Sequence, residues 1–342
     1  PEKEAPRPFI DAVPVGKGEK TRVWQSAADV YETVAAVLDS NLDNLMLTRQ
    51  SPSMVPNSFL RDKSGTLQQR TNNKDFAADV TQAPEYRFRV KRADGFEFWV
   101  TARVPTWHVL GTKLPSFFWF YPREFTDQKQ YDERSRTFNK NSFPNMGAST
   151  KDYLVTLGYA VVEPDCPIVG PAGLMNNLFH ANLRMNMAAI IDELERRGIS
   201  DRDKLALGGH SYGAFGTAHA MIQTPYFKAG IAGDGNYNRT LTPMAFQSEQ
   251  RYLWDAREVY TTMSPLLYAE QLTGALLMYH GMDDQNVGTH PINSERMYQA
   301  LEGLGKPAAL YMYPYEDHGP AARETLLDMW ARWIAWLEKY LK

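Results

Sequence analysis

The sequence predicts an α/β fold with a mostly parallel, doubly wound sheet, preceded by a short all-β segment. From residue 86 onward, short apolar strands alternate with segments of helical periodicity, a pattern typical of helices packed on both faces of a sheet. Before residue 86, short apolar runs are separated by turn residues and show no helical period. The chain has 342 residues, 43% hydrophobic and 23% charged, which is an ordinary globular composition. We therefore expect two parts, residues 1–85 and 86–342.

The first part contains six short apolar runs, and turn residues lie between the members of each successive pair. Such spacing is typical of antiparallel strands, and six strands amount to about one and a half blades of a β-propeller. We expect residues 1–85 to be the last blade or so of a larger propeller whose earlier part is missing from this chain. The expected strands are residues 9–13, 21–25, 31–38, 45–48, 58–61 and 66–70, with Gly16-Lys17-Gly18 as the first turn.

The second part begins with a hairpin, in which residues 86–92 and 96–104 alternate around Ala93-Asp94-Gly95. Residues 176–197 carry apolar residues at helical spacing and end at Gly198, a good C-terminal cap. The further strands that we expect are residues 116–121, 159–163, 204–208, 228–232, 275–280 and 308–313. The further helices that we expect are residues 150–157, 211–223, 291–304 and 321–341.

Charge and apolar content exclude several classes of partner. The formal net charge of −3 indicates no surface for nucleic acid. No apolar run reaches the roughly 18–20 residues of a membrane span. No signal-peptide pattern opens the sequence, which leaves open whether the protein is cytoplasmic, or periplasmic or secreted with its signal absent from this chain.

The cysteine and histidine content argues against a metal site. Cys166 is the single cysteine, so an internal disulfide or a cysteine-rich metal site is excluded. Its turn-like context, Pro164-Asp165-Cys166-Pro167, favours a small buried side chain over a nucleophile. No H-x-x-x-H pair is present, so we expect neither a metal nor a cofactor.

The strongest local signal is Gly209-His210-Ser211-Tyr212-Gly213, a G-x-S-x-G sequence between an expected strand and an expected helix. This context is that of a nucleophile elbow, a sharp turn in which the positions two before and two after the serine crowd each other. Glycine at both positions removes the Cβ clash. We predict that Ser211 is a nucleophile.

A serine hydroxyl needs a base, and the base needs an acid that orients it. The order in this type of fold is Ser, Asp or Glu, then His. Asp283 and Asp284 follow the expected strand at residues 275–280, and chemistry alone leaves the choice between them open. His318 follows the strand at residues 308–313 and is the expected base, whereas structural duties are expected for the other histidines.

At these residues the chain resembles the prolyl oligopeptidase family of serine peptidases, which have the α/β-hydrolase fold, and within it most nearly the glutamyl endopeptidase branch and related bacterial peptidases. The resemblance covers essentially the whole chain. It is carried by Gly208–Gly213, by Asn236–Pro243 with Phe246–Glu249, by Met263-Ser264-Pro265, by His280–Val287, and by Asp317-His318-Gly319.

The family pattern HGxxDxxV, aligned on His280-Gly281, implies that the acid is Asp284, with Asp283 in reserve. It also implies that Asn286 faces the substrate backbone. Family members place a tyrosine hydroxyl in the oxyanion hole after an early strand, which implies this role for Tyr121. The second donor is expected to be the backbone N–H of Tyr212.

The resemblance further implies a peptide substrate and a propeller that screens substrates by size. Here most of the propeller is absent, and its missing portion is the one macromolecular partner we expect. The glutamyl branch cleaves after acidic residues, and an anionic side chain calls for a buried cation. Our first candidate for this cation is Arg239, and Arg123 and Arg184 are the second choices.

The expected reaction is acyl transfer from a peptide through an acyl-enzyme. Two alternatives stay open at the level of the sequence. One is an esterase on the same fold, because the triad does not distinguish an ester from an amide. The other is a non-catalytic binding module on an α/β-hydrolase body.

Overall fold

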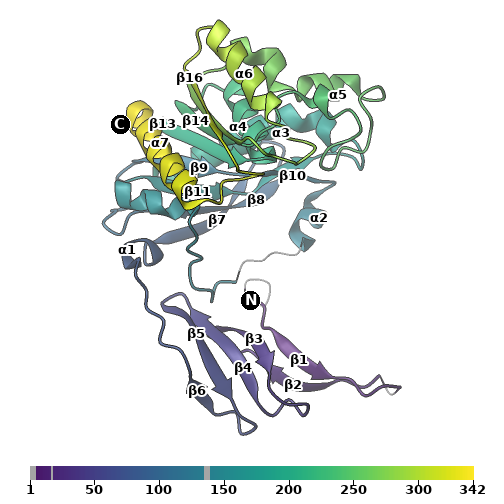
Figure 1. Cartoon of the computed structure of the whole chain (residues 1–342), viewed down its shortest axis with the longest axis vertical. Helices are drawn as coiled ribbons and strands as arrows, with labels where there is room; N and C mark the ends of the chain where they lie inside the picture. Colours follow the sequence, from purple (N-terminus) through teal and green to yellow (C-terminus); the bar gives the residue numbers. More distant parts are fainter. Residues whose placement is uncertain (1–4, 17, 135–138) are drawn as a thin grey trace. The chain divides into compact units, whose positions relative to one another are not determined.

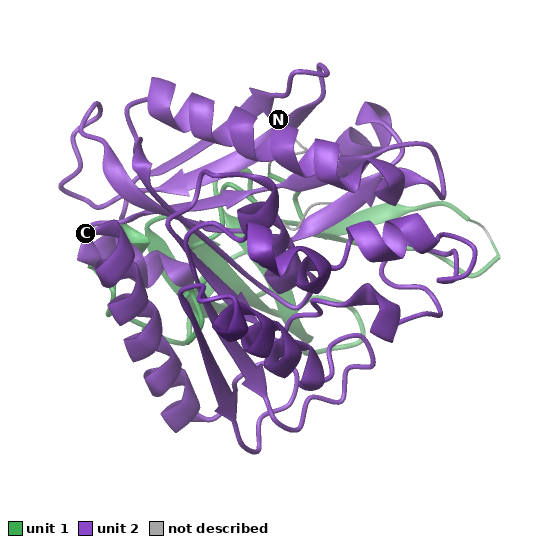
Figure 2. Cartoon of the chain, turned by 90° about the horizontal axis from the view of Figure 1, so that it is seen from above, with its two compact units in different colours: residues 1–82, 135–150 green, residues 83–134, 151–342 purple. Residues whose placement is uncertain are grey.

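The computed structural model describes residues 5–16, 18–134 and 139–342, so Lys17, the centre of the expected first turn, lies outside the described residues. The chain divides into two compact units, which Figure 2 colours separately. The first comprises residues 1–82 and 135–150, and the second comprises residues 83–134 and 151–342. Residues 135–150 thus belong to the first unit, whereas the division expected at residue 85 assigns them to the second part.

The sheets of the first unit are antiparallel, as predicted, and one short helix follows them. The small apolar core of this unit contains Trp24, Leu45 and Leu47. Strands β1 and β2 form an antiparallel pair, and β3, β4, β5 and β6 form a four-stranded antiparallel sheet in chain order. Asn139 Nδ2 donates a hydrogen bond to the Pro6 carbonyl, which ties the returning stretch to this unit. The strands are β1 (Phe9–Ala12), β2 (Thr21–Gln25), β3 (Tyr31–Val37), β4 (Leu45–Ser51), β5 (Met54–Arg61) and β6 (Leu67–Gln69), followed by the short helix α1 (Ala78–Thr81).

The second unit is built on an eight-stranded sheet of order β16-β15-β14-β13-β9-β11-β8-β7. The strands from β16 to β11 run parallel, whereas β8 is antiparallel to both β11 and β7. The mostly parallel sheet that the sequence predicts is confirmed. The strands are β7 (Glu85–Lys91), β8 (Glu97–Arg103), β9 (Leu114–Trp119), β11 (Ala160–Pro164), β13 (Ser200–His210), β14 (Ala229–Gly233), β15 (Ala275–Gly281) and β16 (Ala308–Tyr313).

Helices cover both faces of this sheet (Figure 1). Adjacent residues of a strand point to opposite faces, and β9 shows both environments. Phe117 contacts Trp333 of α7, whereas Phe118 packs in the core cluster that contains the apolar residues of α3 and α4. The helices of this unit are α2 (Gln128–Glu133), α3 (Phe179–Arg196), α4 (Tyr212–Gln223), α5 (Arg257–Thr262), α6 (Ile292–Gly303) and α7 (Arg323–Leu341), with 3₁₀ turns η1 (Lys151–Leu157), η2 (Met175–Leu178), η3 (Arg239–Leu241) and η4 (Pro265–Gln271).

Two short strands, β10 (Pro122–Phe125) and β12 (Cys166–Val169), form a separate parallel pair that the sequence did not predict. Cys166 is 2% exposed, so the buried side chain that the sequence favoured is confirmed, although the residue begins a strand rather than lying in a turn. Prolines suggested a turn, but the ends and edges of small sheets tolerate proline. Burial raises the pKa of the Cys166 thiol to about 12, which keeps this thiol protonated at neutral pH.

Within the described part of the chain, no helix is both long and apolar enough to span a membrane.

Candidate active site

Ser211 lies at the tight turn between β13 and α4. Its backbone has φ 58° and ψ −118°, a strained conformation for a residue with a side chain, and its N–H donates to the Gly233 carbonyl of the neighbouring strand at 2.8 Å. A Cβ on Gly209 would overlap the backbone of Gly213, and a Cβ on Gly213 would lie 2.5 Å from the Phe120 carbonyl oxygen. The two glycines are thus required by close approach of the backbone.

His318 and Asp284 form a hydrogen-bonded pair on neighbouring loops. Nδ1 of His318 donates to Oδ2 of Asp284 at 2.9 Å. The two loops follow β16 and β15, and the carboxyl ends of adjacent parallel strands meet at one edge of a sheet. Asp284 is 2% exposed, whereas Asp283 is exposed to solvent, so only one of the two carboxylates faces the imidazole.

The Asp284 carboxylate is fully hydrogen-bonded. Oδ1 accepts from the backbone N–H of Asn286 at 2.8 Å, and Oδ2 accepts from the Thr289 hydroxyl at 3.0 Å as well as from His318. Burial by itself would raise the pKa of Asp284, but these hydrogen bonds outweigh it and hold the pKa below the ordinary value of 3.8. The carboxylate therefore stays ionised at neutral pH.

His280 supports this carboxylate from inside the fold. Its side chain is completely buried, with Nδ1 at 2.6 Å from the Ser294 hydroxyl and Nε2 at 2.6 Å from the Thr289 carbonyl and 3.1 Å from Asp284 Oδ2. A carbonyl oxygen only accepts, so Nε2 carries the proton and Nδ1 accepts from Ser294. The structural duty expected of His280 is thus to fix Asp284.

A metal ion at this place would disrupt the pair. Among the described residues, ligand atoms of Asp234, His280 and Asp284 lie within 4.8 Å of one another. However, His280 uses both nitrogens in hydrogen bonds, and Asp284 Oδ2 accepts from His318. Coordination would require these bonds to break, so the cluster fits hydrogen bonding better than a cation.

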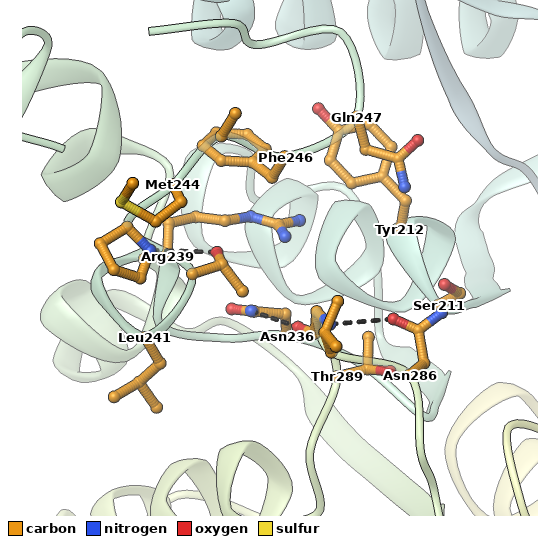
Figure 3. A pocket seen from close by; sticks show the side chains of 15 residues that line it. Ser211, Tyr212, Asn236, Arg239, Leu241, Met244, Phe246, Gln247, Asn286 and Thr289 are labelled. Atoms are coloured by element: carbon orange, nitrogen blue, oxygen red, sulfur yellow. Dashed lines mark hydrogen bonds between the residues drawn. The ribbon is translucent and has the colours of Figure 1, made fainter. Parts of the chain in front are cut away.

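A cavity of about 390 Å³ opens beside Ser211 (Figure 3). Of the residues singled out from the sequence, Ser211, Tyr212, Arg239 and Asn286 all line it. Asn286 Oδ1 accepts from the backbone N–H of Gly288 at 2.9 Å, which holds its side chain at the rim. The remaining walls come from the loop after β14, which supplies Asn236 and residues 241–247, and from residues 287–289.

Arg239 is a buried cation in the wall of this cavity. It is only 3% exposed, and its guanidinium carbon lies 4.4 Å, 4.7 Å and 5.0 Å from the ring centres of Phe215, Phe246 and Tyr212. Nε and Nη2 are buried without a hydrogen-bond partner among the described residues. Burial lowers the pKa of Arg239 to about 10, which still leaves the side chain charged at neutral pH.

Tyr121 lies between β9 and β10, two residues beyond the end of β9, whereas the sequence predicted a strand at residues 116–121 that includes it. Its ring is 5.8 Å from the ring of Tyr212, and its hydroxyl oxygen accepts from Gln247 Nε2 at 3.2 Å. The accepted bond leaves the hydroxyl proton available to another acceptor. The N–H of Tyr212 belongs to the first turn of α4, where amides have no intrahelical acceptor.

The three arginines considered as the substrate-binding cation lie in different places, and only Arg239 lines the cavity at Ser211. Arg184 donates to the backbone and side chain of Gln223 and does not line the cavity at Ser211. Arg123 lines a second cavity, together with Tyr121 and His210. The ring of His318 lies 4.7 Å from that of His210, the residue before Ser211, although the described residues include no hydrogen bond between Ser211 and His318.

Sequence reasoning did not single out Thr289, Asp234 or Gln247. Thr289 binds both members of the His318–Asp284 pair, and buried Asp234 accepts from the N–H of Gly281 at 2.8 Å and lies 3.3 Å from His210 Nε2. The left-handed backbone of Asp234 and Gln247 is invisible in the sequence. Two signals were available: Asp234 lies at the carboxyl end of an expected strand, and Gln247 lies in the segment Phe246–Glu249, which carries part of the family resemblance.

The comparisons with known proteins agree with this architecture. Two curated proteins named "Probable glutamyl endopeptidase, chloroplastic", from Arabidopsis thaliana and Oryza sativa subsp. japonica, are each 34% identical over 97% of the chain. The chain spans 36% and 37% of their respective lengths. Among solved structures, Porphyromonas gingivalis dipeptidyl peptidase 4 matches with a TM-score of 0.72 and 18% identity, over 95% of this chain and 45% of that one.

The α/β-hydrolase fold expected from the sequence is confirmed by the structural match and by the family model. The family model described as "Prolyl oligopeptidase family" matches residues 148–342, the stretch that carries Ser211, Asp284 and His318. The match covers more than half of the sequence, and the chain belongs to the prolyl oligopeptidase family of serine peptidases.

Proposed function

We propose that the protein hydrolyses peptide bonds of oligopeptides through an acyl-enzyme on Ser211. The observation that carries this proposal is the His318–Asp284 hydrogen bond at 2.9 Å, on loops beside the strained turn that holds Ser211. In the proposed reaction, His318 takes the proton of Ser211 as its oxygen attacks the carbonyl carbon. Asp284 holds the imidazole in the tautomer whose Nε2 is free to accept that proton, and stabilises its charged form.

The negative charge that develops on the carbonyl oxygen needs preorganised donors. We assign the Tyr121 hydroxyl and the backbone N–H of Tyr212 to this role. The Gln247 hydrogen bond to the Tyr121 oxygen supports the assignment, because it orients the hydroxyl proton away from Gln247. His318 then protonates the leaving amine, and water hydrolyses the ester by the reverse route.

We also propose that the cavity at Ser211 takes an acidic side chain, so that cleavage follows glutamate or aspartate. An unpaired guanidinium inside a protein is costly unless a ligand supplies the missing charge and acceptors. The two unpartnered nitrogens of Arg239 would receive both oxygens of a carboxylate, the geometry that a guanidinium favours. Asn286, at the rim of the same cavity, is assigned to the substrate backbone.

Replacement of the nucleophile tests the reaction. Ser211→Ala should reduce kcat by about 10⁴–10⁶-fold on every peptide substrate, because the covalent route is lost. A fluorophosphonate probe should label the wild-type protein and not the variant. Wild-type rates in Ser211→Ala, with circular dichroism showing an unchanged fold, would rule out this nucleophile.

The substrate class is tested separately with chromogenic peptides that differ only before the cleaved bond. Glutamate should be preferred over glutamine, which is nearly isosteric but neutral, and over alanine and proline. p-Nitrophenyl acetate provides the comparison with ester hydrolysis. An enzyme that hydrolyses the ester and none of the peptides would be an esterase on the same fold.

We propose further that the first unit is the last part of a β-propeller belonging to a longer parent protein. The four-stranded antiparallel sheet β3-β4-β5-β6 has the make-up of one blade, and the two curated relatives are longer than this chain. Mass spectrometry of the natural protein should find a species longer than 342 residues. A mature natural protein of this length would contradict the propeller proposal.

A further inference from the structure

A second cavity adjoins the reaction centre and has no role in the scheme above. Its volume is about 420 Å³, and its lining includes Tyr121, the proposed oxyanion donor, and His210, the residue before the proposed nucleophile. Four charged side chains complete the polar part of the wall: Arg123, Arg134, Glu163 and Asp165. All of these residues belong to the second unit.

The chemistry of the proposed reaction assigns this cavity to the leaving group. His318 must contact the leaving nitrogen when it returns the proton, so the peptide segment after the cleaved bond passes the His318 ring. The neighbouring ring is that of His210, 4.7 Å away, and His210 lines the second cavity. The first cavity, which is lined by Arg239, Ser211 and Tyr212, then accommodates the side chain of the substrate residue before the cleaved bond.

The four charged side chains in the wall differ in whether they have a partner of opposite charge or a hydrogen bond. Asp165 accepts a hydrogen bond from the Tyr131 hydroxyl at 2.6 Å, and Glu163 interacts electrostatically with Lys151 and Arg103. By contrast, Arg123 and Arg134 have no ion pair with any described residue.

These two arginines instead contact aromatic rings. The guanidinium carbon of Arg123 lies 5.6 Å from the Tyr121 ring centre, and that of Arg134 lies 5.9 Å from the Phe125 ring centre. The hydrogen-bond donors of both guanidinium groups therefore remain available to an anion.

We propose that this second cavity binds a carboxylate on the leaving segment of the peptide, with Arg123 as its main cation. This inference rests on the proposed peptidase function. Arg123 is the better candidate because it is exposed and packs on the ring of Tyr121, the proposed oxyanion donor. The carboxylate comes either from the C-terminus of a short substrate or from an acidic side chain after the cleaved bond.

The experiment compares peptides with glutamate before the cleaved bond and a leaving dipeptide whose C-terminus is a free acid or an amide. A second pair keeps the amide and places glutamate or glutamine in the leaving dipeptide. Product formation is followed by chromatography and mass spectrometry. In the wild-type protein we expect kcat/KM to be about tenfold higher for at least one acidic member, the effect of one charge-assisted hydrogen bond at an exposed site. Which pair shows the preference identifies the source of the carboxylate.

The readout for the variants is the ratio of acidic to neutral leaving groups, which cancels general effects on catalysis. Arg123→Gln should reduce the ratio to about one, and Arg123→Lys should retain part of it, because lysine supplies charge without the guanidinium fork. Arg184→Gln is the matched control, since Arg184 is bound to Gln223 and lies outside the cavity, and it should keep the wild-type ratio.

Equal rates for both members of each pair in the wild-type protein would overturn the inference, and so would a full preference in Arg123→Gln. A glutamyl 4-nitroanilide, whose leaving group carries no peptide, separates these results from failure of the proposed function. Hydrolysis of the anilide without any preference among the peptide pairs would remove only the leaving-group site. No hydrolysis of the anilide or of any peptide would overturn the peptidase proposal and this inference with it.

Discussion

The loop at residues 281–289 and the loop at residues 236–247 both border the cavity at Ser211. They differ in how far the buried charged side chain of each loop is hydrogen-bonded within the protein. In the first loop, the Asp284 carboxylate accepts hydrogen bonds on both oxygens. In the second loop, two nitrogens of the buried Arg239 guanidinium have no partner among the residues described. The Asp284 charge is thus satisfied within the described part of the protein, whereas we propose that a ligand satisfies the charge of Arg239.

Both arrangements follow from the cost of burying charge. A buried ion that its own protein satisfies is rigid and can orient a neighbour without reorganisation. A buried ion without partners raises the free energy of the unliganded protein and gains more than a surface ion when a counter-charge arrives. We therefore expect changes in the first loop to affect all substrates and changes in the second to affect substrates selectively.

The largest effect is expected at Asp284. Asp284→Asn keeps the size of the side chain but removes the charge that fixes the His318 tautomer, so kcat should fall by about 10⁴-fold on acidic and neutral peptides alike. Asp283→Asn is the matched control, because Asp283 is the exposed neighbour, and should change kcat by less than about twofold. Steady-state kinetics on both variants measures this, and a larger loss in Asp283→Asn would reverse our assignment of the acid.

An intermediate effect is expected at Arg239. Arg239→Met replaces the guanidinium with an apolar side chain of similar length, so kcat/KM for glutamyl peptides should fall by about 30–3,000-fold, the cost of leaving a buried charge without its partner. Hydrolysis of glutamine and alanine peptides should change much less. A uniform loss on all peptides would place Arg239 in the scaffold and would remove the distinction between the two loops.

Thermal stability provides an independent test of the role proposed for Arg239. Because the wild-type guanidinium is buried without an ion pair among the described residues, Arg239→Met should be at least as stable as the wild type. The wild type in turn should be stabilised by glutamate-containing product peptides and the variant should not. Thermal unfolding with and without the peptide tests both expectations, and strong destabilisation of the ligand-free variant would contradict the first.

The smallest effect concerns acid stability. The folded-state pKa of Asp284 lies below its ordinary value of 3.8, so the ionised carboxylate stabilises the fold above that pH, and this contribution is lost as the pH falls through the folded-state pKa. The difference in unfolding free energy between wild type and Asp284→Asn should therefore shrink as the pH falls from about 5 toward 3. Urea unfolding at several pH values measures it. A difference independent of pH would show that the carboxylate is not held ionised by its partners.

Part of the candidate active site could be predicted from local sequence. Glycine at positions 209 and 213 is a local steric requirement of the turn around Ser211, so the pattern indicates the turn directly. Local sequence did not decide between Asp283 and Asp284, because the pattern gives no reason to prefer one of two adjacent carboxylates. The choice depended on family resemblance until the fold showed that one of them is buried against His318.

Local sequence patterns were sufficient to predict the alternation of strands and helices, the antiparallel strands of the first unit and the turn at Ser211, because periodicity and turn sterics act between near neighbours in the chain. Three properties became visible only in three dimensions: Arg239 is buried without a hydrogen-bond partner for Nε and Nη2 among the described residues, Gln247 contacts Tyr121, and Arg123 lines a different cavity from Ser211. These properties depend on burial and on contacts between residues far apart in sequence, and no local pattern specifies them.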